Sequence, residues 1–358
     1  MNVFSAPDFN GHEQVVFCHD PTSGLKAIIA IHNTWCGPSL GGCRMWNYHD
    51  ESQALTDVLR LSRGMTYKNA MANLPLGGGK SVIIGDSKRD KTPALMQAMG
   101  HFVDRLGGLY IIAEDVGTSP ADIDEMRKHT DHVAGLSDIS GDPSPITAHG
   151  VFHGILASAR YAFKTDNLKG VKVAVQGLGH VGYYVCKFLH EAGAQLIVTD
   201  IDAQNLEKVV KDFGAKPVHP SLIYDQDVDI FSPCALGAVI NDDTLRRLKA
   251  KIVAGAANNQ LAEVRHGEEI MRKGILYAPD YVINAGGVIN VYHERFMPKY
   301  NKAAALAHVE KIADTLKDVF ERAAAEKIST SLAADRLAEQ RFHSCPLKDS
   351  NGPKGAAA

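Results

Sequence analysis

The sequence feature that most constrains the fold of this chain lies in its second half, at residues 171–202. The apolar, β-branched run 171–175 leads into Gly-Leu-Gly-His-Val-Gly at positions 177–182, and a helical pattern then precedes a second strand that ends at Asp200. In such a unit the first glycine permits a tight turn, the second lets backbone approach a pyrophosphate, and the third lets the helix pack closely on the strand. The phosphates would bind at the helix N-terminus, where unpaired N–H groups favour negative charge. We therefore predict a Rossmann-type domain whose dinucleotide contacts Gly177, Leu178, Gly179, His180, Val181 and Gly182.

The acidic residue at the end of the second strand indicates which dinucleotide is bound. Asp200 stands where a carboxylate accepts hydrogen bonds from the adenosine ribose, and its charge repels a 2′-phosphate, so we expect NAD rather than NADP. Two later strand patterns, at 228–231 and 251–254, run into loops that should face the cofactor, because ligands in such sheets bind beyond the carboxyl ends of the strands. From these loops we expect contacts by Ala235 and Asn258.

Composition excludes several classes of protein. A chain of 358 residues is long enough for two domains with their own cores. Its net charge of -3 offers no basic surface for nucleic acid, and no apolar run approaches the length of a transmembrane helix. The first residues lack the charged and apolar regions of a signal peptide. We therefore expect a cytoplasmic protein with no nucleic-acid or membrane partner.

The six cysteines are scattered and include no C-x-x-C pair, so we expect free thiols rather than a zinc site or a disulfide framework. Cys234 has no histidine beside it in a recognisable motif, and we interpret it as a small residue lining the cofactor site. His293 and Glu294 are not followed by the second histidine of a zinc-binding helix, so no metal is expected.

The N-terminal half shows the patterns of an α/β domain with its own sheet. Two strand patterns, at 14–19 and 25–32, flank a Pro-Thr-Ser-Gly turn and predict a hairpin. The glycine-rich segment 37–44 is expected to be a loop. Helical patterns cover 51–72 and 93–106.

Three charged residues of this half occupy unusual positions. Lys68 continues the apolar row of a helix, although a lysine there commonly buries its stem and solvates its head. Lys80 follows three glycines and superficially suggests a P-loop, but Leu74 stands where that motif needs glycine. Asp115 ends an apolar strand; it is free for chemistry because the segment 118–122 carries its own helix N-cap signature.

These residues resemble the amino-acid dehydrogenases of the glutamate/leucine/phenylalanine/valine family. The blocks that carry the resemblance lie at 37–42, 65–68, 74–80, 113–117, 143–147, 177–182, 233–237, 255–259 and 284–287. It implies a two-domain α/β enzyme with a cleft between the domains: residues 1–147 for substrate binding and oligomerisation, rejoined by a helix at 331–345, and a Rossmann NAD-binding domain at 148–330. The remaining segment, 346–358, has the composition of a disordered tail.

The resemblance also implies roles for individual residues. Lys68 would hold the substrate α-carboxylate, Lys80 would activate water for attack on the imine, and Asp115 would exchange a proton with the amine. Asn284, expected at the end of a strand formed by 281–283, would meet the nicotinamide amide. The remaining expected contacts are those of Thr147 with the cofactor and of Gly41, Gly42 and Asn259 with the substrate.

Two positions favour an apolar substrate. Glutamate-specific members of the family carry lysine where Leu40 stands, and phenylalanine-specific members carry Gly-Pro in place of Ala113 and Glu114, whereas leucine-specific members resemble this chain. The expected pocket walls are Leu40, Met65, Ala113 and Val291. Apolar pockets discriminate by only ~1–3 kcal/mol per methylene, so leucine, isoleucine and valine should all be accepted.

The resemblance thus implies a homo-oligomeric enzyme that reversibly oxidises branched-chain L-amino acids to 2-oxo acids and ammonia with NAD. One alternative is a dehydrogenase of phenylalanine or another aromatic amino acid. A second is a catalytically silent NAD-binding regulator, although such a protein would have no evident use for Lys68, Lys80 and Asp115.

Overall fold

The computed structural model describes residues 3–136, 139 and 141–345 and divides the chain into two compact units. The first unit comprises Met1–Gly141 with Ala338–Ala358, and the second comprises Asp142–Leu337. The segment expected to be disordered, 346–358, lies outside the described residues. Among the described residues, no helix is both long and apolar enough to cross a membrane.

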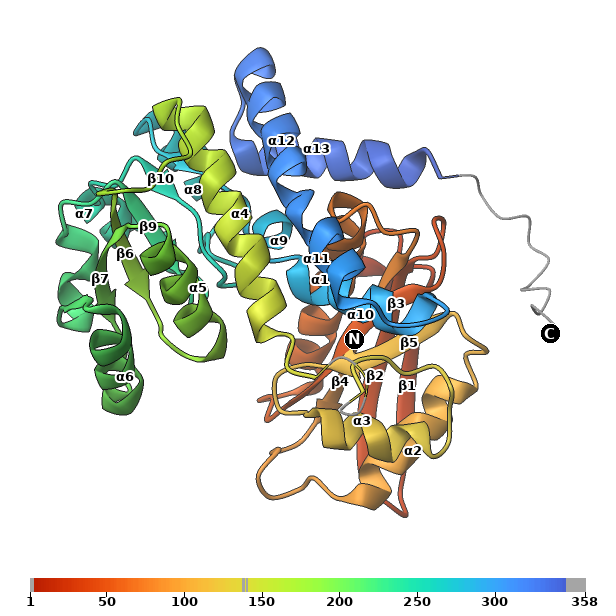
Figure 1. The fold of residues 1–358 in the computed structure, drawn as a ribbon. Helices are drawn as coiled ribbons and strands as arrows, with labels where there is room; N and C mark the ends of the chain where they lie inside the picture. Colours follow the sequence, from red (N-terminus) through yellow and green to blue (C-terminus); the bar gives the residue numbers. More distant parts are fainter. Residues whose placement is uncertain (1–2, 137–138, 140, 346–358) are drawn as a thin grey trace. The chain divides into compact units, whose positions relative to one another are not determined.

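The first unit is a mixed five-stranded sheet with helices on both faces (Figure 1). Its elements are a 3-10 helix (Val3–Ser5), β1 (Gln14–Asp20), β2 (Leu25–Asn33), β3 (Ser39–Trp46), α1 (Glu51–Met71), β4 (Gly77–Ile84), α2 (Pro93–Asp104), β5 (Tyr110–Glu114) and α3 (Pro120–Arg127). The strand order is β1-β2-β4-β3-β5. The expected hairpin is confirmed, since β1 pairs antiparallel with β2.

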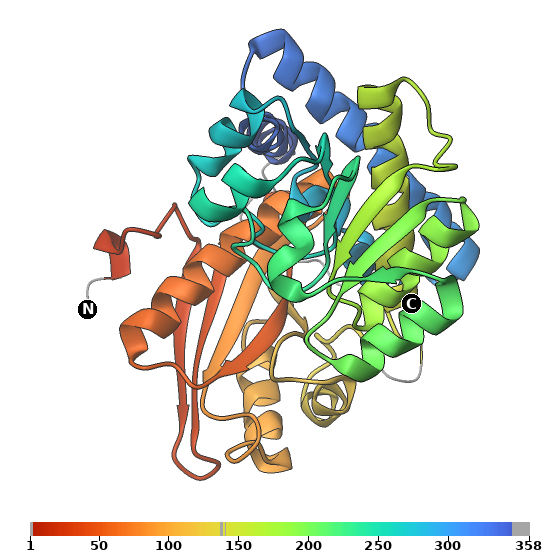
Figure 2. The same ribbon diagram turned by 90° about the vertical axis from the view of Figure 1, so that its left-hand side faces the viewer.

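Alternation along β2 explains why both faces of this sheet are covered. Ile28 and Ala30 point into a core shared with α1, whereas Ile29 and Ile31 point into the core beneath α2 and α3. Figure 2 shows α1, in orange-red, lying along one face of the sheet. Successive side chains of a strand alternate between faces, so a continuous apolar run is the pattern of a strand buried on both sides.

The prediction of a loop at 37–44 is wrong, because Ser39–Trp46 form β3, which lies between β4 and β5 and runs parallel to both. A Cβ at Gly41 would lie 1.8 Å from the carbonyl oxygen of Gly79, and a Cβ at Gly42 would lie 2.4 Å from that of Glu114. Glycine usually weakens a strand, but here it is the residue that permits the neighbouring backbones to approach this closely.

The second unit holds a six-stranded sheet in the order β11-β10-β9-β6-β7-β8, with every strand pair parallel. Its elements are α4 (Ser144–Phe163), β6 (Lys172–Gln176), α5 (His180–Glu191), β7 (Gln195–Thr199), α6 (Ala203–Phe213), β8 (Lys216–Pro217), the 3-10 helix η2 (Pro220–Asp225), β9 (Ile230–Pro233), α7 (Asp242–Arg247), β10 (Ile252–Val253), α8 (His266–Arg272), β11 (Leu276–Tyr277), α9 (Asp280–Ile283), α10 (Gly286–Phe296), α11 (Lys302–Glu310) and α12 (Ile312–Glu326). A last helix, α13 (Thr330–His343), begins in the second unit and ends in the first. The predicted fold class, with one α/β sheet in each unit and the second of Rossmann type, is confirmed.

The strand expected at 281–283 is instead the short helix α9, which leads into α10. Three apolar residues are too few for periodicity to separate a strand from a helix. Asp280 opens the first turn of α9, where a negative charge favours the helix N-terminus. Gly286 then begins α10 where a Cβ would lie 2.6 Å from the carbonyl oxygen of Ile146, so the glycine allows α10 to start against α4.

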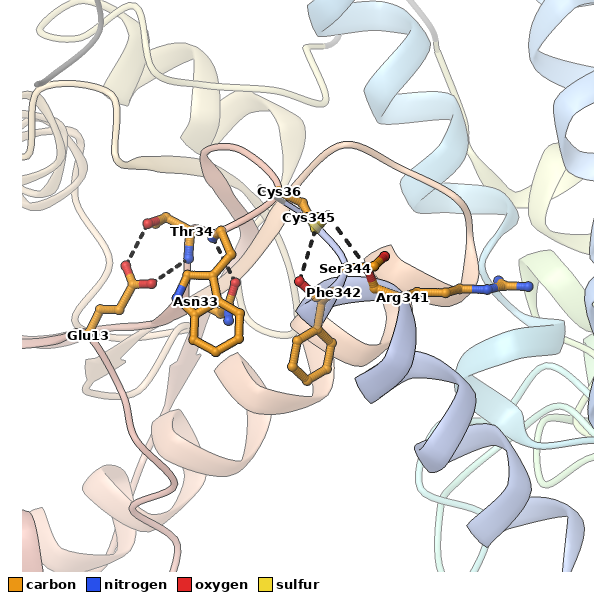
Figure 3. The surroundings of a disulfide bond; sticks show 9 residues. Glu13, Asn33, Thr34, Cys36, Arg341, Phe342, Ser344 and Cys345 are labelled. Atoms are coloured by element: carbon orange, nitrogen blue, oxygen red, sulfur yellow. Dashed lines mark hydrogen bonds between the residues drawn. A yellow bond between two sulfur atoms is a disulfide. The ribbon is translucent and has the colours of Figure 1, made fainter. Parts of the chain in front are cut away.

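The expectation of free thiols fails for two of the six cysteines. Cys36, between β2 and β3, forms a disulfide with Cys345, which follows α13 (Figure 3). The two residues are 309 positions apart, and no local motif links them. Aromatic contacts bring the segments together: the ring of Phe342 lies 6.1 Å from Trp35 and 5.5 Å from Tyr67, centroid to centroid. The free cysteines of the described chain are Cys18, Cys43, Cys186 and Cys234.

Candidate active site

The first unit contains a buried ion pair between two of the residues selected from the sequence. Lys80 lies in β4 and Asp115 directly follows β5, and β3 separates the two strands. The Nζ atom of Lys80 is 2.9 Å from Oδ2 of Asp115. Only 6% of Lys80 is exposed, and 23% of the Asp115 side chain. The sheet therefore holds an ammonium and a carboxylate in contact, largely shielded from water.

A second cation, missed by the sequence analysis, contacts the same carboxylate oxygen. Arg44 of β3 donates from Nε to Oδ2 of Asp115 at 3.1 Å. Its NH1 group donates to Oδ2 of Asp57 at 3.0 Å, and that oxygen also accepts from the Tyr48 hydroxyl at 2.6 Å. The register pairs Cys43 with Glu114, so β3 brings the next residue on, Arg44, beside Asp115. Because 37–44 was expected to be a loop, the sequence carried no signal for this contact.

The charges around Asp115 set its protonation state. Burial alone would raise the pKa of this carboxyl, but the Lys80 ammonium and then the Arg44 guanidinium outweigh burial and hold the pKa below its ordinary value. The backbone fixes the residue as well: the Asp115 N–H donates to the Thr118 hydroxyl at 2.9 Å, and that hydroxyl donates to the Cys43 carbonyl at 2.8 Å. As expected, Ser119 caps α3, with Asp122 accepting from its N–H at 2.8 Å, so Asp115 does not serve as the cap.

The expected pocket residues of the first unit gather around the glycines of β3. Leu40, almost fully buried, pairs with Ile111 of β5, and Gly42 pairs with Ala113. A Cβ at Gly41 would lie 3.2 Å from Cγ of Met65, and one at Gly42 would lie 2.8 Å from Cβ of Asp115. Backbone and apolar side chains therefore lie next to the ion pair.

Lys68 lies in the last turn of α1 and is half-buried. This helix packs tightly on β4, since a Cβ at Gly78 would lie 2.0 Å from the backbone nitrogen of Thr66. The end of α1 therefore adjoins the strand that carries Lys80. The two other expected substrate contacts belong to the second unit: Val291 is half-buried on α10, and Asn259, with φ of 51°, is exposed after β10.

The glycine motif of the second unit forms the turn between β6 and α5. Gly177 has φ of 92°, and a Cβ there would lie 2.5 Å from that of Ala235. A Cβ at Gly182 would lie 2.0 Å from the Gly177 carbonyl oxygen, so this glycine is required for the turn to close. At Gly179, by contrast, no heavy atom of the described residues other than those of its two chain neighbours lies within 4 Å of the added Cβ. A glycine that the protein does not need sterically, exposed at a helix N-terminus, fits close approach of a ligand phosphate.

The remaining residues of the motif surround this turn. Leu178 is buried and anchors it, whereas His180 and Val181 open α5 with exposed and half-exposed side chains. The carboxylate of Asp200, after β7, accepts from the Leu178 N–H at 2.6 Å and from the Asp202 N–H at 2.8 Å. Asp200 is half-exposed, so the carboxylate that braces the turn also remains within reach of solvent.

A second group of expected cofactor contacts meets at the end of the parallel sheet. Asn284 donates from Nδ2 to Oδ1 of Asn258 at 2.7 Å and to the Ala256 carbonyl at 3.1 Å, while its own Oδ1 is buried and has no partner within the described chain. The Thr147 hydroxyl lies 3.1 Å from where a Cβ of Gly287 would stand. The strand order reverses between β6 and β9, which is where such sheets bind dinucleotides, and the loops after both strands carry expected contacts. The residues present therefore fit a dinucleotide.

Comparison with known proteins identifies the class. Residues 12–132 match the dimerisation domain of the Glu/Leu/Phe/Val dehydrogenases, and residues 140–205 and 198–342 match the Glutamate/Leucine/Phenylalanine/Valine dehydrogenase family. The chain belongs to this family of amino-acid dehydrogenases.

Individual relatives are similar over nearly the whole chain. The leucine dehydrogenase of Bacillus subtilis (strain 168) is 56% identical over 345 residues, 96% of this chain and 94% of that protein. The phenylalanine dehydrogenase of Caldalkalibacillus thermarum (strain TA2.A1) is 47% identical over 350 residues, 96% of this chain and 94% of that protein. The crystal structure of L-tryptophan dehydrogenase from Nostoc punctiforme superposes with a TM-score of 0.84 at 49% identity, covering 94% of this chain and 97% of that one. The resemblance inferred from sequence, including that to leucine dehydrogenases, is confirmed.

Proposed function

We propose that this chain catalyses the NAD-dependent, reversible oxidative deamination of branched-chain L-amino acids, leucine among them. In the deaminating direction the amino acid, water and NAD⁺ give the 2-oxo acid, ammonium, NADH and a proton. The observation that carries the proposal is the buried contact of Lys80 with Asp115, 2.9 Å long, in a chain of the amino-acid dehydrogenase family.

The charged residues of the first unit have separate roles in this proposal. Lys68 holds the substrate α-carboxylate and so fixes the orientation of the Cα–H bond. Asp115 takes a proton from the substrate ammonium, and its low pKa keeps it ionised for that purpose. Lys80 assists the attack of water on the imine carbon, after which the tetrahedral species loses ammonia. A bound NAD⁺ would supply the hydride acceptor.

The residues of the second unit would hold the cofactor. The turn 177–182 receives the pyrophosphate, Asp200 the adenosine ribose, and Asn284 with Asn258 and Thr147 the nicotinamide end. The half-exposed carboxylate of Asp200 supports NAD over NADP because it would repel a 2′-phosphate.

The preferred substrate side chain is inferred from the residues around the β3 glycines. Leu40, Met65 and Ala113 are uncharged residues at or beside the β3 glycines, which suits leucine, isoleucine and valine. An aromatic substrate is the second candidate, because a phenylalanine and a tryptophan dehydrogenase are 47% and 49% identical to this chain. Specificity constants for leucine, valine, phenylalanine and tryptophan decide between the two.

We further propose that the first unit serves substrate binding and self-association and the second unit cofactor binding, with the division near residue 147. The family match at 12–132 is to a dimerisation domain, which supports association of identical chains. Light scattering after size-exclusion chromatography measures it. The cytoplasm is the proposed location, since a free amino acid and NAD are solutes there.

The test of the activity is NADH formation with a panel of L-amino acids and their D-enantiomers. Lys80→Ala and Asp115→Asn should each abolish turnover, whereas NAD binding, followed by protein fluorescence, persists in both. Lys128→Ala is the control, because this lysine is exposed at the end of α3 and its ion-pair partner among the described residues is Glu125. Turnover close to wild type in either active-site variant would refute the proposal.

Cofactor binding has its own test at Gly179. Within the described part of the chain a methyl group there meets no obstruction, so Gly179→Ala should fold normally but raise the KM for NAD by 10-fold or more, on the order of 1.4 kcal/mol. The control is Gly64→Ala, an equally unobstructed position on α1. An unchanged KM for NAD would show that the pyrophosphate does not bind at this turn.

A further inference from the structure

Three potential metal ligands meet in the second unit, and none of the three has a role in the proposed chemistry. His149 and His153 stand one turn apart on α4, and Glu310 is the last residue of α11. The Nε2 atom of His149 lies 3.1 Å from Oε1 of Glu310, and that of His153 lies 3.9 Å from the same oxygen. All three potential ligand atoms lie within 4.8 Å of one another.

These separations suit a small divalent ion. Zinc binds imidazole nitrogen and carboxylate oxygen at about 2.0–2.2 Å, which places tetrahedral ligand atoms about 3.3 Å apart. The two measured separations of 3.1 and 3.9 Å bracket that value, so small side-chain movements would close the site. Two imidazoles and one carboxylate leave a fourth position for water.

Aromatic packing limits the freedom of both histidines. The ring of His149 lies edge-on to Phe188 of α5 at 5.8 Å, and the ring of His153 lies edge-on to Phe152 at 5.8 Å.

A second cluster shows what an unsuitable site looks like. Asp242, His266 and Glu269 also approach one another within 4.8 Å. There, however, Arg265 donates to both oxygens of Asp242 at 2.7 and 2.8 Å and to Glu269 at 2.8 Å, so a guanidinium already supplies the positive charge. Within the described chain, no lysine or arginine forms an ion pair with Glu310.

We propose that His149, His153 and Glu310 form a binding site for a divalent first-row transition metal ion, with Zn²⁺ the best match, which joins α4 to α11. Imidazole and carboxylate ligands together favour Zn²⁺, Co²⁺ or Ni²⁺ over Mg²⁺ or Ca²⁺, which prefer oxygen alone. None of the three ligands has a role in the proposed dehydrogenase activity, and the ion would act by holding two helices together. The sequence did not indicate this site because the carboxylate lies 161 residues from His149, beyond any local spacing.

The test is a titration of the chelator-treated full chain with Zn²⁺, followed by calorimetry, and with Co²⁺, followed by visible absorption. We expect one Zn²⁺ per chain and a Co²⁺ spectrum of nitrogen and oxygen ligation without a sulfur charge-transfer band, which separates this site from the free thiols. His149→Ala, His153→Ala and Glu310→Gln should each weaken binding by more than about 10-fold. Glu310→Gln keeps the shape of the side chain and therefore guards against a trivial loss of folding.

Two controls match the cluster. His101→Ala removes one of a pair of histidine rings 4.0 Å apart in the first unit, and Asp242→Asn alters the second cluster. Neither should change the titration. Zn²⁺ should also raise the unfolding temperature of the wild type but not that of the three ligand variants, because an ion that binds only the folded state stabilises it. Absence of binding at micromolar Zn²⁺, or binding unchanged in the ligand variants, overturns the proposal.

Discussion

At the scale of single residues, the central feature is one carboxylate held between two cations. Asp115 contacts Lys80 at 2.9 Å and Arg44 at 3.1 Å, and Arg44 is itself held by Asp57. Removing one partner of a buried pair leaves the other charge poorly compensated, which costs about 3–5 kcal/mol when burial is complete. In the proposed reaction we therefore assign Arg44 the role of positioning Asp115.

Replacement of Arg44 tests this positioning role. Arg44→Met should lower kcat by up to about 100-fold through misplacement of Asp115, with a smaller change in KM. The acid limb of the pH–rate profile should move to higher pH, because loss of one cation raises the pKa of Asp115. Arg44→Lys should restore part of the activity. Arg60→Met is the control, since Arg60 pairs with Asp8 and is 68% exposed. A fall in stability with an unmoved pH profile would leave Arg44 with a structural role only.

The same carboxylate should make stability depend on pH. The pKa of Asp115 in the folded chain lies below its ordinary value of 3.8, so the unfolded chain takes up the proton more readily. Its contribution to the free energy of unfolding is then complete above pH 3.8 and is lost as the pH falls towards the lower, folded pKa.

Urea unfolding between pH 7 and pH 3 measures this effect. The stability gap between the wild type and Asp115→Asn should narrow as the pH falls below 3.8. Asp227→Asn serves as the control, because this side chain is 87% exposed. A gap that stays constant over this range would show that the ion pair does not favour the ionised form.

At the scale of elements, β3 shows how glycine can build a strand instead of ending one. Its glycines lie where neighbouring backbones leave no room for Cβ atoms, and the strand then carries Arg44 to the carboxyl end of β5. The element that appeared least regular in sequence therefore positions the candidate site.

A methyl group at Gly42 should disrupt this arrangement. The added Cβ would lie 2.4 Å from the Glu114 carbonyl oxygen and 2.8 Å from the Asp115 Cβ, so β5 must shift. We expect Gly42→Ala to lose stability by about 1–3 kcal/mol and most of its turnover. Gly64→Ala, exposed in the middle of α1, should instead stabilise by about 0.5–1 kcal/mol. Thermal unfolding and NADH formation compare them, and a fully active Gly42→Ala would contradict this account of β3.

At the scale of the whole molecule, the main feature is a disulfide bond that no local sequence pattern indicated. The Cys36–Cys345 disulfide joins segments 309 residues apart within the first unit. Such a link restricts the unfolded chain, with an effect on stability of about 0–5 kcal/mol.

The disulfide should therefore be detectable in unfolding experiments. Cys345→Ser should unfold at a lower temperature than the wild type under oxidising conditions, because the unfolded chain is no longer cross-linked. A reducing agent should lower the unfolding temperature of the wild type to that of the variant and should not change the unfolding temperature of the variant. Equal unfolding temperatures in oxidising buffer would mean that the bond is absent in solution or does not affect stability.

The glycine motif was readable because its requirements are local. The turn between β6 and α5 depends on three glycines within six residues, and Asp200 lies at the end of the next strand. The parallel sheet and the apolar run of β2 follow from equally short patterns. Lys80 and Asp115 stood out because isolated charges at the ends of apolar or glycine-rich runs are costly without partners.

The sequence by itself thus determined the Rossmann unit, the two α/β sheets, the family and the charged residues to be tested by mutation. Only the tertiary structure decided which side chains contact one another. Three contacts show this: Arg44 lies beside Asp115, Cys36 is bonded to Cys345, and His149 lies beside Glu310. The members of these pairs are 71, 309 and 161 residues apart in the sequence. These contacts depend on strand register and helix packing. Both are determined by the burial of apolar side chains throughout the core, and local sequence periodicity does not indicate them.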